Sequence, residues 1–426
     1  MHEPSGLAGR SSLKGYSFAS LLRHALTGHR NWPAAWRSPP ARKHYEVVII
    51  GAGGHGLATA YYLAKKHGIS DVAVLDKGWL GGGNSGRNTQ VTRSNYFWPQ
   101  SAAFYDHALK LYEGLGQELN FNVMLSQRGV LNLAHSDHEL EGLRRWTNAI
   151  KINGVDSEMI TAEEIRKLIP LLNLDARFPV LGGFIQHRGG ISRHDAVVWG
   201  YARAANALGV DIIQQCEVTG IDIGNGKVAG VQTTEGSISA DRVCINVAGH
   251  TSVLAGMAGF PVPITSMALQ AMVSEPIKPC LDTVVVSPRI HMYVSQSDRG
   301  EIVIGGAADG YTSYAQRGGI PALEENIAAL LELFPAFSRL RLMRQWAGTV
   351  DISPDTTPIM GRTPVQRLYI NGGWGTGGYK AIPAGGDTMA HTIVHDEPHP
   401  LIADFSLERF ERGALIDESA AAGVAH

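Results

Sequence analysis

The sequence has few cysteines, and they form no recognisable motif. Only Cys216, Cys244 and Cys280 are present among 426 residues, and they are too far apart for a Cys-x-x-Cys pair. This spacing argues against both a disulfide framework and a zinc site. We therefore expect a protein of a reducing, cytoplasmic compartment without a bound metal.

Long apolar runs and an excess of one charge are also missing. The best candidate for a membrane span, residues 47–63, is interrupted by glycines and by His55, whereas a spanning helix needs about 20 apolar residues. Lys and Arg (37) nearly balance Asp and Glu (39), so no basic surface for nucleic acid or an acidic membrane is indicated. We expect neither nucleic acid nor a membrane as a partner.

Acidic residues are almost absent from the first 44 positions, where Glu3 faces seven Lys and Arg residues. Such a composition is typical of an organelle transit peptide. An arm that packs on a partner subunit is the alternative that we favour, because the segment also carries an apolar set that could form one face: Phe18, Leu21, Leu22, Leu26 and Trp32.

Glycine, in contrast, is abundant, with 50 residues, which indicates many tight turns and close backbone approaches. Residues 45–50 predict a buried strand, 56–66 a helix and 71–76 a second strand. This order of elements is a parallel, right-handed βαβ unit. Further strands are expected over 210–215, 227–234, 241–247 and 368–371 in the same layer.

The turn of this unit carries a dinucleotide-binding pattern. Gly51, Gly53, Gly54 and Gly56 match G-x-G-x-x-G between strand and helix. There a pyrophosphate can meet backbone N–H groups at the helix N-terminus. Asp76 follows Gly56 by 20 residues and is the acid expected to hold a ribose hydroxyl.

A second group of strands, at 268–274, 283–286, 291–295 and 301–305, predicts another sheet, one face of which could cover the cofactor. Amphipathic helices are expected over 101–119, 139–152 and 323–334, and Thr161-x-x-Glu164 is a capping box. We therefore expect an α/β fold in which a Rossmann-like domain is interleaved with a mixed-sheet substrate domain. The expected parts are an N-terminal arm (1–44), a cofactor domain (45–125, 186–263 and 345–400), a substrate domain (126–185 and 264–344) and a C-terminal tail (401–426).

Two further glycine-rich segments favour a flavin over a nicotinamide. Residues 81–88 would form a long flexible loop around the ribityl and ring end of FAD, and this loop leads to Arg93, which is either an anion-binding or a surface arginine. Residues 372–380 precede a helix expected near Ala384, whose positive N-terminus would face the N1/C2 edge of the ring. Lys380 would then pair with a substrate carboxylate, although a solvated lysine is the alternative.

His194 lies where a helix is expected to begin. Ser192-x-x-Asp195 resembles a helix start before residues 196–208, which places His194 in the first turn. The helix dipole there keeps imidazole neutral, as covalent attachment to a flavin would require. A capping histidine is the simpler interpretation of the residues alone.

Taken together, these segments resemble the β subunits of heterotetrameric sarcosine oxidases, a branch of the D-amino acid oxidase-like FAD-dependent oxidoreductases. The resemblance covers nearly the whole chain. It is carried by residues 20–25, 51–56, 127–133, 193–197, 373–380 and 413–418.

The resemblance implies a noncovalent FAD that oxidises sarcosine to glycine, with Lys380 and Arg93 on the substrate carboxylate. It also implies a covalent FMN on His194 that passes electrons to O2 to give H2O2, and α, γ and δ partner subunits, of which α passes the one-carbon unit to tetrahydrofolate. Alternatives are a stand-alone oxidase or dehydrogenase of glycine, dimethylglycine or another amine, and a non-catalytic flavoprotein scaffold. The residues expected to contact FAD are Gly51, Gly53, Gly54, Gly56, Asp76, Lys77, Gly83, Asn84, Ser85, Arg87, Val218, Gly249, Gly375, Gly378 and Lys380.

Overall fold

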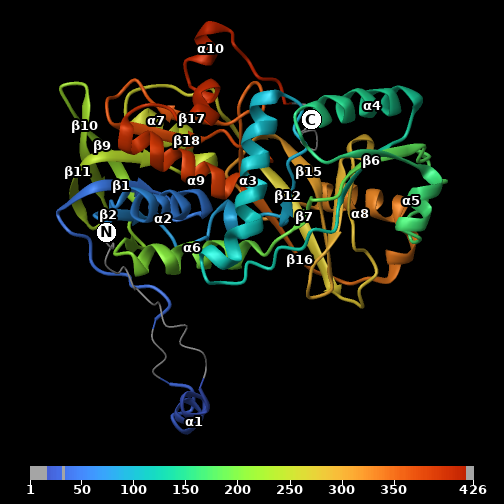
Figure 1. Cartoon of the computed structure of the whole chain (residues 1–426), viewed down its shortest axis with the longest axis horizontal. Helices are drawn as coiled ribbons and strands as arrows, with labels where there is room; N and C mark the ends of the chain where they lie inside the picture. The colour runs from blue at the N-terminus through green and yellow to red at the C-terminus, as the bar shows by residue number, and fades with distance from the viewer. Residues whose placement is uncertain (1–16, 31–33, 419–426) are drawn as a thin grey trace, which may run out of the picture.

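The computed structural model describes residues 17–30 and 34–418. Two large mixed sheets lie beside each other, and the chain passes between them several times (Figure 1). The first sheet has the order β17-β18-β11-β1-β2-β8, and β10 and β9 continue from β11 as an antiparallel extension. Its strands are β1 (His44–Ile50), β2 (Val72–Leu75), β8 (Asp211–Ile213), β9 (Val218–Gly224), β10 (Lys227–Thr233), β11 (Gly236–Ile245), β17 (Ile359–Arg362) and β18 (Leu368–Gly372).

The predicted βαβ unit is confirmed at the centre of this sheet. β1 is parallel to both neighbours, with Ile50 opposite Leu75 of β2 and Ile245 of β11. Its apolar side chains are buried on both faces, as expected for a central parallel strand. Helix α2 (Gly54–His67) follows directly and ends at Gly68, which adopts the left-handed conformation that glycine tolerates.

The second sheet has the order β16-β12-β15-β14-β13-β4-β6-β5. The four strands expected there are confirmed, and β4, β5, β6 and β16 join them. Because β16 belongs to this sheet, the domain boundary expected after residue 344 falls inside a strand. Its strands are β4 (Val130–Ala134), β5 (Glu158–Thr161), β6 (Gly182–Gln186), β12 (Thr265–Pro276), β13 (Val284–Ser287), β14 (Met292–Gln296), β15 (Glu301–Thr312) and β16 (Leu342–Ile352). Two further short strands, β3 (Val91–Thr92) and β7 (Gly190–Ile191), pair with each other.

Helices cover both sheets. Four helices form one connected group, in which α2 contacts α9 (Gly378–His395) and α6 (His194–Ala207), and α3 (Pro99–Glu118) contacts α9. The capping box before α5 (Ala162–Leu168) is confirmed, because Thr161 Oγ1 accepts from Glu164 N while Glu164 accepts from Thr161 N. The other helices are α4 (Asp137–Ile152), α7 (Thr251–Met257), α8 (Ile320–Leu333) and α10 (Arg409–Arg412). No described helix is long and apolar enough to cross a membrane.

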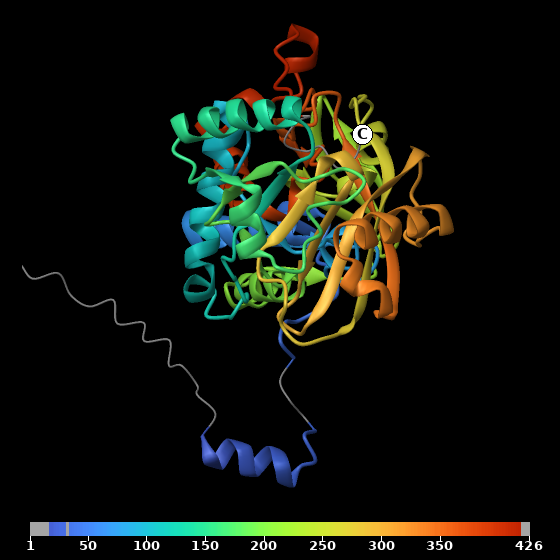
Figure 2. The same ribbon diagram turned by 90° about the vertical axis from the view of Figure 1, so that its right-hand side faces the viewer.

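The N-terminal helix α1 (Phe18–Leu26) lies away from the body in both views (Figures 1 and 2). None of its residues is buried, and Phe18 and Leu26 are about 80% exposed. Trp32 of the expected apolar set lies outside the described residues. So do Arg10 and Lys14, two of the seven basic residues of the arm. Within the described part of the arm, the apolar face is therefore present and uncovered.

Candidate functional site

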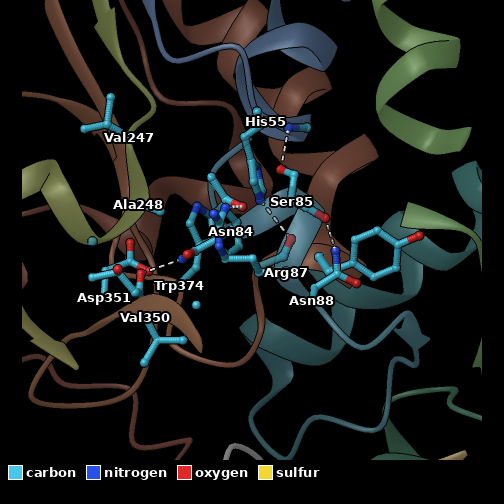
Figure 3. A pocket seen from close by; sticks show the side chains of 18 of the residues that line it. His55, Asn84, Ser85, Arg87, Asn88, Val247, Ala248, Val350, Asp351 and Trp374 are labelled. Carbon is cyan, nitrogen blue, oxygen red and sulfur yellow. Dashed lines mark hydrogen bonds between the residues drawn. The ribbon is translucent and has the colours of Figure 1, made fainter. Parts of the chain in front are cut away.

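A cavity of about 550 Å³ lies where the two sheets meet, and both sheets contribute residues to its wall. In Figure 3, Val247 and Ala248, which follow β11, lie to the left of Asn84, with Val350 and Asp351 of β16 below them. Nearly all residues expected in the site line it. They are Gly51, Gly53, Gly54, Asp76, Lys77, Gly83, Asn84, Ser85, Arg87, Arg93, Val218, Gly249, Gly375, Gly378 and Lys380, whereas Gly56 and His194 do not.

The turn between β1 and α2 is possible only with glycine. A Cβ at Gly51 would lie 2.2 Å from the carbonyl oxygen of Asn246, and one at Gly56 would lie 2.0 Å from the carbonyl oxygen of Gly51. Gly51 also has φ +109°. The bare turn brings the N-terminus of α2 to the cavity wall, where it can meet a phosphate group. Gly56 thus shapes the turn without touching the cavity.

The second glycine segment is more ordered than expected. Instead of a long flexible loop, residues 84–87 form a short 3₁₀ helix, η1 (Asn84–Arg87). Ser85 Oγ accepts from Gly54 N at 2.9 Å, and Asn84 donates to the carbonyl oxygen of Thr349 at 2.5 Å. Because these bonds reach α2 and β16, η1 bridges the two sheets at the cavity. Arg87 donates to the carbonyl oxygens of Gly82 and Gly83 rather than pointing into open space.

Asp76 braces the turns on both sides of its strand end. Its carboxylate accepts from Ala52 N and Gly78 N, each at 2.8 Å. Burial raises the pKa of this carboxyl above its ordinary value despite those bonds. Next to it, Lys77 Nζ lies 3.2 Å from His250 Nε2. A carboxylate at this edge, beside the β1–α2 turn, fits the ribose of a dinucleotide.

Lys380 is a buried cation that also lines the cavity. Helix α9 begins at Gly378, six residues earlier than expected, so Lys380 lies in its first turn and not in a loop. Lys380 is only 7% exposed, and its Nζ donates to the carbonyl oxygen of Thr376 at 2.9 Å. Burial, and then the charge of Arg93, lower the pKa of Lys380 well below its usual value. A helix N-terminus adds to this positive potential.

Arg93 lies close enough to Lys380 to repel its charge. The guanidinium donates to Asn95 Oδ1 at 2.6 Å and lies 4.8 Å from the centre of the Tyr96 ring. The structure therefore brings together the two cations that the sequence placed nearly 300 positions apart. Two cations held in one partly enclosed cavity favour an anionic ligand, because only opposite charge offsets their desolvation.

His55 and Trp374 are site residues that the sequence motifs did not single out. Their rings stack at 4.4 Å, and His55 Nε2 lies 2.8 Å from the carbonyl oxygen of Gly378. Because a carbonyl only accepts, Nε2 carries the proton. Burial lowers the pKa of His55 to about 4, so the ring stays neutral. His55 thereby ties the start of α2 to the start of α9, and its place inside the glycine motif was the available signal.

Several buried polar atoms in the cavity wall have no partner among the described residues. They include Asn246 Oδ1, Thr349 Oγ1 and Asn371 Nδ2. Buried polar groups are normally satisfied, so these atoms point to a polar ligand that bonds them. Together with the glycine turn and the two helix N-termini, they fit a dinucleotide as large as FAD.

Asp351 is a fully buried carboxyl that also lines the cavity. Its Oδ2 accepts from Gly373 N at 2.6 Å, and its backbone oxygen accepts from Gly375 N at 2.8 Å. Asp351 therefore holds the turn that leads into α9. Burial raises the pKa of this carboxyl to about 7, so its charge changes near neutral pH.

This shift predicts a pH-dependent stability of the flavin-free protein. Because the folded pKa lies above the ordinary one, folding is favoured below about pH 4 and progressively disfavoured as the pH rises to about 7. Asp351→Asn removes that titration. The free energy of unfolding of the variant, relative to that of the wild type, should therefore increase by about 1–3 kcal/mol when the pH is raised from about 5 to about 8. Urea unfolding at both pH values measures this difference. An equal difference at both would contradict the raised pKa.

His194 is the first residue of α6, which confirms its expected place in the first turn. The cap is Arg193 and not Ser192, because Ser192 bonds Tyr379 Oη at 2.7 Å instead. His194 lies outside the cavity wall, mostly buried, and its Nδ1 has no partner among the described residues. Burial lowers the pKa of His194, which keeps the ring neutral.

Comparison with known proteins places this geometry in a family. The model of the DAO family, FAD dependent oxidoreductases, matches residues 46–392. The sarcosine oxidase subunit beta of Rhodobacter capsulatus is 54% identical over 97% of this chain and 100% of its own length. That of an Arthrobacter species is 54% identical over 92% and 97%. Among solved structures, the L-proline dehydrogenase from P. horikoshii superposes with a TM-score of 0.83 at 27% identity, covering 88% of this chain and all of the other.

The matched region contains both sheets, the glycine turn and the Lys380 end of the cavity. The family match also explains why the Rossmann-like part and the mixed-sheet part occur together, which is the fold expected from the sequence. The chain therefore belongs to the DAO family of FAD-dependent oxidoreductases and, within it, to the sarcosine oxidase β subunits, which makes it a flavin-dependent amine oxidoreductase.

Proposed function

We propose that this chain oxidises sarcosine to glycine within a multi-subunit sarcosine oxidase. The observation that carries the proposal is a pair of neighbouring cations, the buried Lys380 and the half-buried Arg93, in the wall of the cavity that the glycine turn also lines. The names of the half-identical relatives support sarcosine as the substrate. Bound FAD would supply the two-electron acceptor for the substrate C–N bond.

The role of the two cations follows from the burial of Lys380 and from the closeness of Arg93 to it. A lone buried ammonium is costly, and a carboxylate beside Lys380 Nζ offsets that cost while adding charge-assisted hydrogen bonds. Arg93 can approach the same carboxylate from another segment. With its carboxylate held, the small amino acid has little freedom left, so its methylamine end is oriented within the cavity.

The remaining cofactor-contacting roles are proposed from position. The α2 N-terminus with Gly51, Gly53 and Gly54 would hold the pyrophosphate, and Asp76 the ribose. Residues of η1 and the start of α9 would hold the ring end, where the helix N-terminus favours negative charge on the reduced ring. We also propose that the two sheets define the cofactor and substrate domains, with β16 counted in the second.

We further propose that His194 carries a covalent FMN. Its neutral ring, unpartnered Nδ1 and position outside the main cavity support a second site. The β-subunit resemblance implies that electrons then reach O2 through this FMN to give H2O2, and that an α subunit passes the one-carbon unit to tetrahydrofolate, with γ and δ subunits completing a cytoplasmic complex. The exposed arm helix α1 is a candidate contact for one of these partners.

Intact mass after unfolding tests the FMN proposal. A covalent adduct of FMN mass on the peptide that contains His194, absent in His194→Ala, is the expected result. His391→Ala is the matched control, since His391 also has an unpartnered Nδ1 but lies far along α9. Release of all flavin on unfolding would contradict the proposal.

Anaerobic mixing with candidate substrates tests the proposed reaction. Sarcosine should bleach the flavin absorbance at lower concentration than glycine, dimethylglycine or L-proline. Proline is included because a proline dehydrogenase shares this fold at 27% identity. A stronger preference for any of the other three would overturn sarcosine as the substrate.

A further inference from the structure

The C-terminal segment 413–418 folds back onto the body and contacts the start of α3. Glu418 is almost fully buried, and its two carboxylate oxygens accept from Phe97 N at 3.1 Å and from Trp98 N at 3.0 Å. Trp98 Nε1 donates to the carbonyl oxygen of Asp417 at 2.6 Å. Because Trp98 offers no side-chain cap to α3, Glu418 supplies the cap from more than 300 residues away.

A buried ion pair fixes the backbone of this segment. Arg409 and Asp355 form a fully buried ion pair at 2.8 Å. Asp355 also accepts from Ile416 N at 3.1 Å through its side chain and from Glu418 N at 3.1 Å through its backbone oxygen. The buried pair thus fixes the backbone that presents the Glu418 carboxylate.

The start of α3 connects this segment to the cavity. Arg93 precedes Phe97 by four residues, and its guanidinium rests on the ring of Tyr96. Tyr96 stacks on Tyr105 of α3 at 3.6 Å. A Cβ at Gly377 would meet the Tyr105 hydroxyl at 2.3 Å and the Tyr96 hydroxyl at 3.1 Å, so this ring pair packs directly against the start of α9.

Charge reinforces this connection. Burial raises the pKa of Glu418 to about 6, against the bonds from Trp98 N and Phe97 N and, more weakly, the charge of Arg93, all of which lower it. Both carboxylate oxygens accept from backbone N–H groups, and Glu418 is not among the residues of the cavity wall. It can steady Arg93 without competing for the site.

We propose that the segment 413–418 is a clasp that positions Arg93 for a substrate carboxylate, with Glu418 as its positioning residue. The inference rests on the proposed function, since it takes Arg93 as a carboxylate-binding residue. The family model ends at residue 392. The clasp therefore lies beyond the part of the chain that the family model matches.

Glu418→Gln tests the clasp in the full-length flavin-loaded protein. The substitution keeps the shape but removes the charge and sets an NH2 group against one of the two backbone donors, Phe97 N or Trp98 N. Losing such a cap should speed amide hydrogen exchange at Phe97 and Trp98, and raise the sarcosine concentration for half-maximal flavin reduction, each by about three- to tenfold. The limiting reduction rate should stay within about twofold, because the reacting atoms are untouched.

Glu411→Gln is the matched control, because Glu411 is exposed in the same C-terminal region and should leave both values unchanged. Trp98→Phe, which removes the bond to Asp417 and part of the ring that contacts Phe97 but keeps Glu418 in place, should shift both values in the same direction by less. An unchanged half-saturating concentration in Glu418→Gln would overturn the clasp. A fall in the limiting reduction rate alone would also overturn it. So would a change in both the half-saturating concentration and the limiting rate that is accompanied by a lower unfolding midpoint.

Failure of the clasp can be separated from failure of the proposed function. If sarcosine does not reduce the wild-type flavin, the proposed substrate is wrong. Acetate binding, followed by its effect on the flavin spectrum, then measures the carboxylate site directly. The clasp still requires weaker acetate binding in Glu418→Gln than in Glu411→Gln, and equal binding would overturn it.

Discussion

Lys380→Met should raise the sarcosine concentration needed for half-maximal flavin reduction by about 30- to 5,000-fold. This range corresponds to about 2–5 kcal/mol, the usual cost of removing one partner of a buried charge pair. The thioether fills much of the volume of the lysine stem but leaves the substrate carboxylate without its closest cation. Anaerobic stopped-flow measurement of flavin absorbance gives the concentration dependence directly.

Among the lysines that the structure describes, Lys380 is distinguished by its burial. Lys151→Met is the matched control, because Lys151 lies exposed in the last turn of α4 and should behave as the wild type. Removing a buried, lone ammonium should also leave stability unchanged or slightly higher. An unchanged concentration dependence in Lys380→Met would remove this residue from the substrate site.

Gly56→Ala should disrupt FAD binding although Gly56 does not touch the cavity. The new Cβ would lie 2.0 Å from the carbonyl oxygen of Gly51, and since a Cβ is fixed to the backbone and the oxygen is part of it, no side-chain rotation relieves the contact. The turn must shift, at a cost of about 1–3 kcal/mol. If the whole cost falls on cofactor binding, FAD affinity drops by about 5- to 150-fold. Titration of the flavin-free protein with FAD, followed by flavin fluorescence, measures the change.

A control in another helix isolates the steric effect. Gly114→Ala places a Cβ in open space on α3, so it should stabilise the protein by about 0.5–1 kcal/mol and leave FAD affinity as it is. If Gly56→Ala binds FAD as tightly as Gly114→Ala, the turn is more adaptable than its contacts indicate.

Local patterns predicted the parts of the fold that depend on local physics. The buried β1, the glycine turn, the capping box at Thr161 and the first-turn position of His194 all follow from residues within one turn or strand of each other. The predicted start of α9 was wrong because the glycine-rich residues 372–378 are typical of a loop. In the structure the helix begins at Gly378, where the His55 bond holds its first carbonyl.

The site residues that sequence reasoning missed are held by long-range contacts. Asp351 has no motif, and it matters only because β16 passes beside residues 373–375. Similarly, residues 84–87 are ordered by bonds to α2 and β16, so a glycine-rich sequence alone indicated flexibility. Glu418 lies near the C-terminus, and only the folded structure shows that it caps α3.

The central claim is that the cavity between the two sheets holds FAD with the substrate carboxylate on Lys380 and Arg93. A crystal structure of the flavin-loaded protein with acetate tests it most directly. We predict the FAD pyrophosphate at Gly51–Gly54 and the acetate carboxylate within hydrogen-bond distance of Lys380 Nζ. Acetate bound elsewhere, with Lys380 still bonded only to the carbonyl oxygen of Thr376, would contradict it.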